Sequence, residues 1–134
     1  MKKANSKEQF FTRTKANKGV KIPLVSSTGE ETDEWIQVLS IQSDAYRKIS
    51  TEERRKAITA GMAGEAYQLD EVRVNASLIC AWSFDDECKP EDVYEFLIEA
   101  PQIADEVSMK AMDSASFFAP TPTSSSKGSE KKPT

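Results

Sequence analysis

The first regular pattern along the chain is an alternation of apolar and polar positions that begins at Val20. Val20, Ile22 and Leu24 are separated by single residues, the period of two that is typical of a strand. Pro23 cannot donate a ladder hydrogen bond, so we expect this strand at the edge of a sheet. A turn-forming cluster over residues 26–30 leads into a β-branched and aromatic run over residues 35–41. The pattern predicts a β-hairpin over about residues 19–41.

Beyond this hairpin the apolar positions recur every three or four residues, which predicts about four helices. We expect them over about residues 43–62, 65–83, 90–99 and 101–118. Ser43 is a suitable N-cap, and Pro90 and Pro101 suit first helical turns, where the missing N–H of proline has no helical partner. The helix over residues 65–83 has the widest apolar face, so it should be the most buried.

These elements predict an α-dominated α+β fold, with an N-terminal β-hairpin, about four helices and a disordered C-terminal tail. A polar basic arm over residues 1–9 precedes one globular domain over residues 10–118, in which Phe10 and Phe11 are expected to anchor the arm. Residues 119–134 hold no large apolar side chain that could offset the entropy of ordering, so they are predicted to be a disordered tail. The expected core side chains are Trp35, Leu69, Val72, Ile79, Trp82, Phe96, Leu97, Ile103 and Val107.

The composition removes most catalytic chemistry. The 134 residues include no histidine, the commonest general base and metal ligand, and only two cysteines. Cys80 falls in the most apolar predicted helix as a small core residue, and three acidic residues before Cys88 should make its thiol less reactive. No glycine-rich phosphate-binding motif is present. We therefore expect no catalytic residue, no metal site and no cofactor, and a protein that is not an enzyme.

No apolar run reaches the roughly 20 residues of a membrane span. The lysines near the N-terminus are not followed by the apolar stretch of a signal peptide. These features predict a soluble intracellular protein with no membrane contact.

The net charge of −4 conceals two regions of opposite sign. Residues 1–22 carry seven Lys or Arg and one Glu, whereas residues 85–113 carry two Lys and ten acidic residues. Such a division favours head-to-tail association of copies, with Lys15, Lys18 and Lys21 as candidate self-association residues, although both regions can also be ordinary solvated surface. Nucleic-acid binding is the weaker interpretation of the basic end, because the rest of the domain is acidic.

A second candidate surface lies at the end of the last predicted helix. Met109, Met112, Phe117 and Phe118 precede the polar tail, and methionine and aromatic side chains in such a place often mark a surface for an apolar partner. The alternative is that Phe118 closes the protein's own core. Met112 lies off the main apolar stripe and is the better candidate for a shared surface.

Several segments, taken in their order along residues 10–118, resemble the tail assembly chaperones of long-tailed, non-contractile bacteriophages. The segments are Ile22-Pro23-Leu24 through Gly29-Glu30-Glu31, Trp35-Ile36-Gln37-Val38-Leu39, Ser43-Asp44-Ala45-Tyr46, Leu78-Ile79-Cys80-Ala81-Trp82-Ser83-Phe84, Pro90-Glu91, Phe96-Leu97, Ala100-Pro101-Gln102-Ile103 and Phe117-Phe118. The resemblance implies a small, mostly helical protein that coats the tape measure protein while the tail tube polymerises around it. It also implies self-association in rings or spirals, action in the host bacterial cytoplasm and absence from the mature virion.

Many proteins of that family are made in two lengths by a programmed frameshift, and the longer form recruits the tail tube protein. This chain would then be the short form. Its segment Glu130-Lys131-Lys132 allows a slippery run of adenines if the codons are GAA AAA AAA. Two alternatives remain open from the sequence: a structural virion protein, such as a head–tail joining or minor tail subunit, and a small nucleic-acid-binding regulator.

Overall fold

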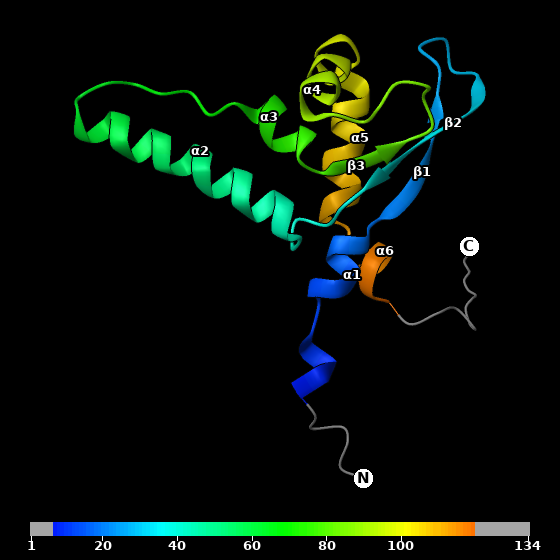
Figure 1. The fold of residues 1–134 in the computed structure, drawn as a ribbon, viewed down its shortest axis with the longest axis horizontal. Helices are drawn as coiled ribbons and strands as arrows, with labels where there is room; N and C mark the ends of the chain where they lie inside the picture. Colours follow the sequence, from blue (N-terminus) through cyan, green and yellow to red (C-terminus); the bar gives the residue numbers. More distant parts are fainter. Residues whose placement is uncertain (1–6, 120–134) are drawn as a thin grey trace, which may run out of the picture.

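A three-stranded antiparallel sheet and six α-helices make up the computed structural model over residues 7–119, the part of the chain that it describes (Figure 1). The predicted α-dominated α+β fold class is confirmed. The predictions of a polar arm at residues 1–6 and of a disordered tail at residues 120–134 lie outside the described residues. Lys7–Phe10, which the predicted arm includes in part, form a 3₁₀ turn, η2.

The N-terminal hairpin is confirmed. Strand β1 (Val20–Val25) pairs with β2 (Glu31–Val38), and the register places Ile22 opposite Ile36. The pairing is irregular between Pro23 and Val25. The strand order is β1-β2-β3, so β1 lies at an edge, where the missing N–H of Pro23 is tolerated.

The predicted helix over residues 65–83 is wrong. Residues 65–70 form an irregular segment, α3 is a short helix (Glu71–Ala76), and β3 (Ile79–Trp82) is a strand antiparallel to β2. Short apolar runs fit a helix or a strand equally well by periodicity alone. Here β3 supplies hydrogen bonds to an edge of β2 that would otherwise be unpaired.

The other predicted helices are present, with two changes. Ser43 caps α2 (Asp44–Met62), since its Oγ accepts a hydrogen bond from the Tyr46 N–H at 3.3 Å. Proline lies in the first turn of both α4 (Pro90–Glu99) and α5 (Pro101–Met112). The expected helix over residues 101–118 is interrupted at Asp113, whose backbone is extended, and α6 (Ser114–Phe118) follows. The sequence analysis also missed α1 (Arg13–Lys18), which is held by the fully buried Ala16.

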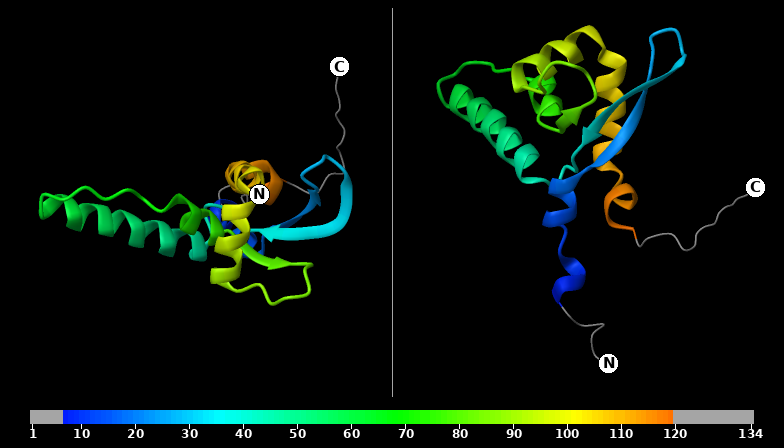
Figure 2. Two further views of the ribbon diagram at one scale, coloured as in Figure 1. Left: turned by 90° about the horizontal axis from the view of Figure 1, so that it is seen from above. Right: turned by 45° about the vertical axis from the view of Figure 1, so that its right-hand side comes forward.

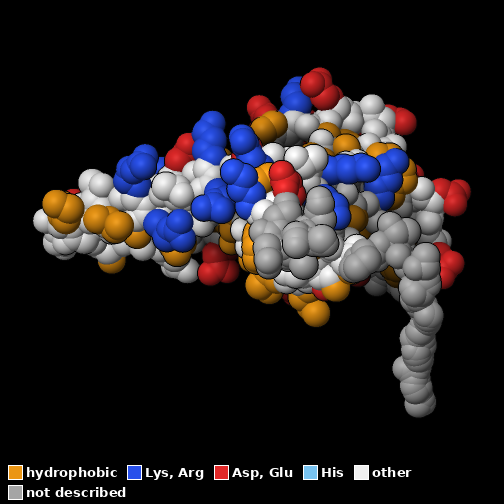
Figure 3. Space-filling view, turned by 90° about the horizontal axis from the view of Figure 1, so that it is seen from below, with side chains coloured by type: hydrophobic (Ala, Val, Ile, Leu, Met, Phe, Trp, Pro, Cys, Tyr) orange, Lys and Arg blue, Asp and Glu red, His pale blue; other side chains and the backbone are white. Residues whose placement is uncertain are grey.

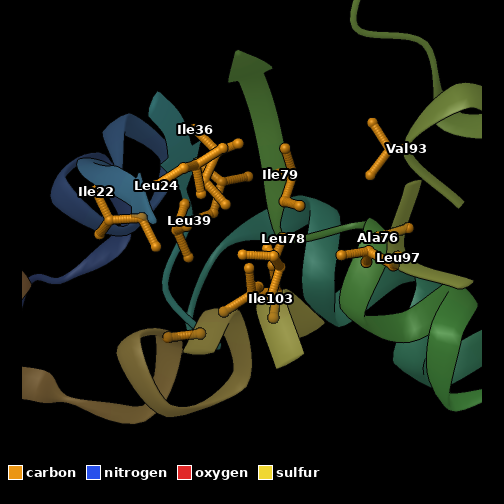
Figure 4. Close-up of a cluster of buried hydrophobic side chains, with 13 residues drawn as sticks. Ile22, Leu24, Ile36, Leu39, Ala76, Leu78, Ile79, Val93, Leu97 and Ile103 are labelled. Atoms are coloured by element: carbon orange, nitrogen blue, oxygen red, sulfur yellow. The ribbon is translucent and has the colours of Figure 1, made fainter. Parts of the chain in front are cut away.

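The core lies between one face of the sheet and α3, α4 and α5 (Figure 4). Its least exposed large side chains are Ile36, Val38, Leu78, Val93, Leu97 and Val107. The hairpin alternation places Ile22, Leu24 and Ile36 on this face. Helices α4 and α5 complete the core through apolar positions spaced by three or four residues, as an amphipathic helix requires.

The predicted core is correct at its centre and wrong at its edges. Ile79, Leu97, Ile103 and Val107 are buried as expected, and Val72, Trp82 and Phe96 are half-buried against the core. Two predictions fail, at Trp35 and Leu69.

Trp35 points to the outer face of the sheet, because the side chains of a strand alternate and its neighbour Ile36 takes the inner face. Leu69 is exposed because residues 65–70 are not helical. Phe10 and Phe11 do not anchor the N-terminal segment either, since their side chains are 75% and 64% exposed.

Helix α2 extends away from the rest of the domain as an arm, and residues 65–70 run back along it to α3 (Figures 1 and 2). Glu53 is the only buried residue among its 19. The apolar stripe predicted along this helix is therefore largely uncovered at its far end, where Ile58 and Met62 are 64% and 84% exposed.

Gly19 joins α1 to β1 with a backbone conformation (φ 77°, ψ −177°) that is essentially restricted to glycine. A Cβ at this position would lie 2.6 Å from the Val38 carbonyl oxygen. We expect Gly19→Ala to lower the free energy of unfolding by about 1–3 kcal/mol, measured by urea denaturation. Gly64 also has a positive φ but open space around it, so Gly64→Ala is the control and should have the smaller effect. Equal effects would contradict the role of the close approach to Val38.

Among the described residues, no helix combines the length and the apolar character needed to cross a bilayer. The longest, α2, carries eight charged side chains.

Candidate binding surfaces

The two cysteines are poorly suited to nucleophilic chemistry. Cys80 is an exposed residue of β3, which corrects its expected place in the core, and its Sγ donates to the Gln37 carbonyl at 3.7 Å. Desolvation raises the pKa of the Cys80 thiol and is also the main cause that raises the pKa of Cys88. In the part of the chain that the structure describes, no three His, Cys, Asp or Glu side chains gather where they could hold a metal ion.

The four residues predicted to bind a partner do not form one surface. Met109 and Met112 of α5 are 70% and 58% exposed, as a shared surface requires. Phe117 is buried and packs against the half-buried Phe118, with ring centroids 5.9 Å apart. The break at Asp113 turns α6 back toward α1, so Phe117 belongs to the protein's own packing.

Met109 also lines a groove between α5 and the free edge of β1. The groove has a volume of about 480 Å³, and its walls include Pro23 and Val25 from β1 and Glu106 and Lys110 from α5. An exposed methionine beside a strand edge can adapt to apolar partners of different shape, because its side chain is flexible and polarizable. Of the predicted residues, Met109 and Met112 therefore remain candidates for partner binding.

The three predicted self-association lysines occupy two different settings. Lys15 and Lys18 are exposed on α1, which is attached to the start of α2 by the Arg13–Asp44 ion pair at 2.8 Å. The hydrogen bonds that Arg13 and, to a lesser extent, Asn17 donate to the Asp44 carboxylate lower the pKa of that carboxyl. Lys21 is instead used within the chain, because its Nζ lies 4.0 Å above the ring of Trp35.

Glu53 is the anchor that fastens the arm to the domain. Its carboxylate accepts hydrogen bonds from the Tyr67 hydroxyl at 2.7 Å, the Asp70 N–H at 2.9 Å and Arg73 Nη1 at 2.9 Å. Arg73 also binds Glu52 at 2.7 Å. These contacts fix the returning segment and α3 against the middle of α2.

The same contacts keep Glu53 ionised. They lower its pKa to about 2, chiefly through the Asp70 N–H and next through the Tyr67 hydroxyl, and they outweigh the desolvation that acts in the opposite direction. Asp70 extends the network, since its side chain accepts from the N–H of Arg73 and from the hydroxyl of Tyr94.

The sequence contained a signal for this anchor that the sequence analysis missed. Tyr46, Ile49, Glu53 and Ala57 follow one another at spacings of three or four, so the acidic residue lies on the apolar face of α2. A charged side chain on such a face is expected to be paired when that face is covered.

Helix α2 carries many charged side chains from its first turn to its middle, in addition to the exposed apolar side chains at its far end. Arg47, Lys48, Arg54 and Arg55 are exposed, and within the described residues none of them forms an ion pair within 4 Å. Lys and Arg side chains gather along the arm in the view from below (Figure 3). The arm is thus a basic and partly apolar projection.

The segments that carry the resemblance to the chaperone family mostly lie in the sheet, in the core and at helix starts. Examples are Ile36 and Leu97 in the core and Pro101 at the start of α5. They account for how the chain folds more than for what it binds. No model of a known protein family, no curated protein and no solved structure matches the chain.

Proposed function

We propose that this protein is a bacteriophage tail assembly chaperone, a non-enzymatic protein that coats the tape measure protein and helps to recruit tail tube subunits. The observation that carries the proposal is the order of the segments between Ile22 and Phe118 that resemble this family. The tail tube protein would be recruited by a longer, frameshifted form. The chain would act in the host bacterial cytoplasm and would not be retained in the mature virion.

The surfaces of the domain support a binding role. A chaperone for a long helical client needs exposed apolar side chains and many copies, because multivalency supplies avidity without catalysis. Met109 and Met112 on α5 provide such side chains next to a groove along β1. The arm formed by α2 provides a second exposed surface with Ile58 and Met62.

The neighbourhood of the gene tests the proposal first. We expect a tail tube gene upstream and a very long helical coding region downstream, with a reading frame that overlaps the end of this gene. Mass spectrometry of purified particles then separates the proposal from its first alternative, since a head–tail joining or minor tail subunit would remain in virions. A gel-shift assay with duplex DNA tests the regulator, whose binding would fall steeply with salt.

The exposed methionines of α5 give the proposal a residue-level prediction. We expect co-expression with the protein encoded by the long downstream region to keep that protein soluble. Met109→Ser/Met112→Ser should reduce the soluble fraction severalfold, because it removes apolar contact area from the client surface. Sedimentation of the lysate followed by quantitative blotting measures the effect.

Met62→Ser is the control, since it removes a still more exposed methionine from the tip of the arm. A loss of client solubility with Met62→Ser alone would overturn the placement of the client on α5. Failure of the native chain to keep the client soluble would overturn the chaperone function itself.

A further inference from the structure

An apolar groove lies between the outer half of the hairpin and the start of α5, at the end of the domain far from α1. Its volume is about 240 Å³, below the range of roughly 300–1,000 Å³ that small-molecule sites occupy. Leu24 and Val25 form one wall, Ile103 forms the other, and Phe84 and Phe96 are the aromatic side chains between them. The size and lining suit one or two inserted side chains of a protein.

The walls of this groove are fixed by contacts within the domain. Phe84 and Phe96 lie 5.4 Å apart between ring centroids, and each packs against Trp82 at 5.2 and 5.8 Å. On the hairpin, Thr32 Oγ1 donates to the Leu24 carbonyl at 2.8 Å. Ser83 Oγ donates to Glu34 at 2.6 Å, which ties β2 in the outer half of the hairpin to the segment that carries Phe84. The groove is therefore formed before any partner arrives, which lowers the ordering cost of binding.

The rim of the groove is acidic. Residues 26–34 of the hairpin carry four acidic side chains and no Lys or Arg. Glu34 lines the groove itself, and Glu99 directly precedes Ala100, which also lines it. A partner with apolar side chains flanked by positive charge fits this combination.

The N-terminal segment of the same chain has that chemistry. Phe10 and Phe11 are two adjacent large side chains, 75% and 64% exposed. Lys7 precedes them, and Arg13, Lys15 and Lys18 follow on α1. Asn17 Oδ1 accepts from the Asp44 N–H at 2.8 Å, and this contact together with the Arg13–Asp44 pair directs the segment outward from the start of α2.

The two surfaces lie at opposite ends of the molecule. The segment with η2 projects from the bottom of the view in Figure 1, whereas the hairpin turn, α4 and the start of α5 lie at the top. The phenylalanines of one chain are therefore directed away from its own groove. We infer that Phe10 and Phe11 of one copy insert into the groove of a second copy, with the lysines of α1 facing the acidic hairpin.

Such a contact is heterologous, because it joins two different surfaces of the same chain. Repetition closes into a ring or continues as a helical assembly, depending on the rotation between copies. The inference deepens the proposed function, since it supplies the arrangement of many copies along an elongated client. Its test uses the purified chain alone, so failure of self-association and failure of client binding remain distinguishable.

Sedimentation velocity over a concentration series tests the contact. We expect the native chain to assemble with rising concentration, and Phe10→Ser/Phe11→Ser to weaken assembly about tenfold or more, because these rings lose their burial. Val25→Lys/Gln102→Lys, which changes two exposed groove positions, should weaken it to a similar extent by placing positive charge against the basic segment. All four positions are exposed, so circular dichroism should show unchanged folding.

Mixing the two variants is the decisive measurement. One retains the groove and the other retains the phenylalanines, so a head-to-tail contact predicts a 1:1 complex in the mixture that neither variant forms alone. Lys15→Glu/Lys18→Glu, which leaves the groove unchanged, should also weaken assembly of the chain, most strongly at low salt. Ile58→Ser/Met62→Ser on the arm is the control and should assemble as the native chain does.

Three outcomes would overturn the contact: a native chain that stays monomeric at its highest soluble concentration, phenylalanine variants that assemble normally, or a mixture that forms no complex.

Discussion

Replacing Leu97 with alanine is expected to lower the free energy of unfolding by about 2–5 kcal/mol, the largest effect that we expect from a single truncation. Leu97 is 1% exposed and belongs to the core cluster, where α4 packs against α3. Truncation removes Cγ and both Cδ atoms from that packing and leaves only Cβ. The result follows from lost burial together with the cavity left behind, because surrounding side chains relax only in part.

The next residue in the chain supplies the control. Ile98 lies on the same helix but is 50% exposed, so Ile98→Ala should change the free energy of unfolding by no more than about 0.5 kcal/mol. Urea denaturation of both variants measures the difference, provided that the denaturant slope is unchanged. Equal losses for the two variants would mean that α4 does not present Leu97 to the core.

The contrast between Leu97 and Ile98 illustrates which parts of the fold are predictable from sequence. Where an element has one buried face, the spacing of apolar residues determines its type and its orientation. The hairpin, α4 and the start of α5 follow this rule, helped by Pro23, Pro90 and Pro101, whose backbone limits are local.

The prediction failed where neighbours, not local spacing, decided the structure. The segment Ile79–Trp82 becomes a strand because β2 offers it an unpaired edge, and that edge depends on residues some 40 positions earlier in the chain. Leu69 was expected in the core only as part of the helix that this strand replaces. The position of Trp35 on the outer face of the sheet depends likewise on which face of the hairpin meets the helices.

The candidate binding surfaces also divide into features that local sequence determines and features that depend on distant segments. Local sequence identified Met109 and Met112 as unburied methionines, but the burial of Phe117 depends on the change of direction at Asp113. The groove beside Phe96 could not be predicted at all, because it brings the hairpin together with residues at the junction of α4 and α5. A surface built from distant segments has no single signature in the sequence.

Glu53 lies in α2, the longest described helix, none of whose apolar side chains is fully buried. Within this helix, only Tyr46 near its start packs against the core. The attachment of its middle to the returning segment and α3 therefore depends on the Glu53 carboxylate and on the donors of Tyr67, Asp70 and Arg73. All three donors stabilise the ionised form of Glu53. The arm is therefore held by an interaction whose strength changes with pH.

We expect the stability that Glu53 contributes to disappear at low pH. Its pKa is lowered to about 2 in the folded chain, against about 4.3 for an unperturbed glutamate. A carboxyl with a depressed folded pKa stabilises the fold fully above the unfolded value, and the contribution is lost as the pH falls from there toward about 2. Glu53→Gln should therefore be less stable than the native chain near neutral pH, and the difference should close as the pH approaches about 2.

Urea denaturation of both proteins across this pH range measures the difference, and amide exchange of residues 65–76 locates it. Subtracting the variant from the native chain removes the contributions of other acidic residues, including Asp44 and Glu52, whose pKa values are also lowered. Glu52→Gln is the control, because Glu52 binds Arg73 from a more exposed position and does not contact Tyr67 or the Asp70 N–H. Glu52→Gln should leave most of the pH dependence of the free energy of unfolding unchanged. It should also leave the returning segment protected from amide exchange. A stability difference between native chain and Glu53→Gln that stays constant down to the lowest pH would mean that the carboxylate charge does not hold the arm.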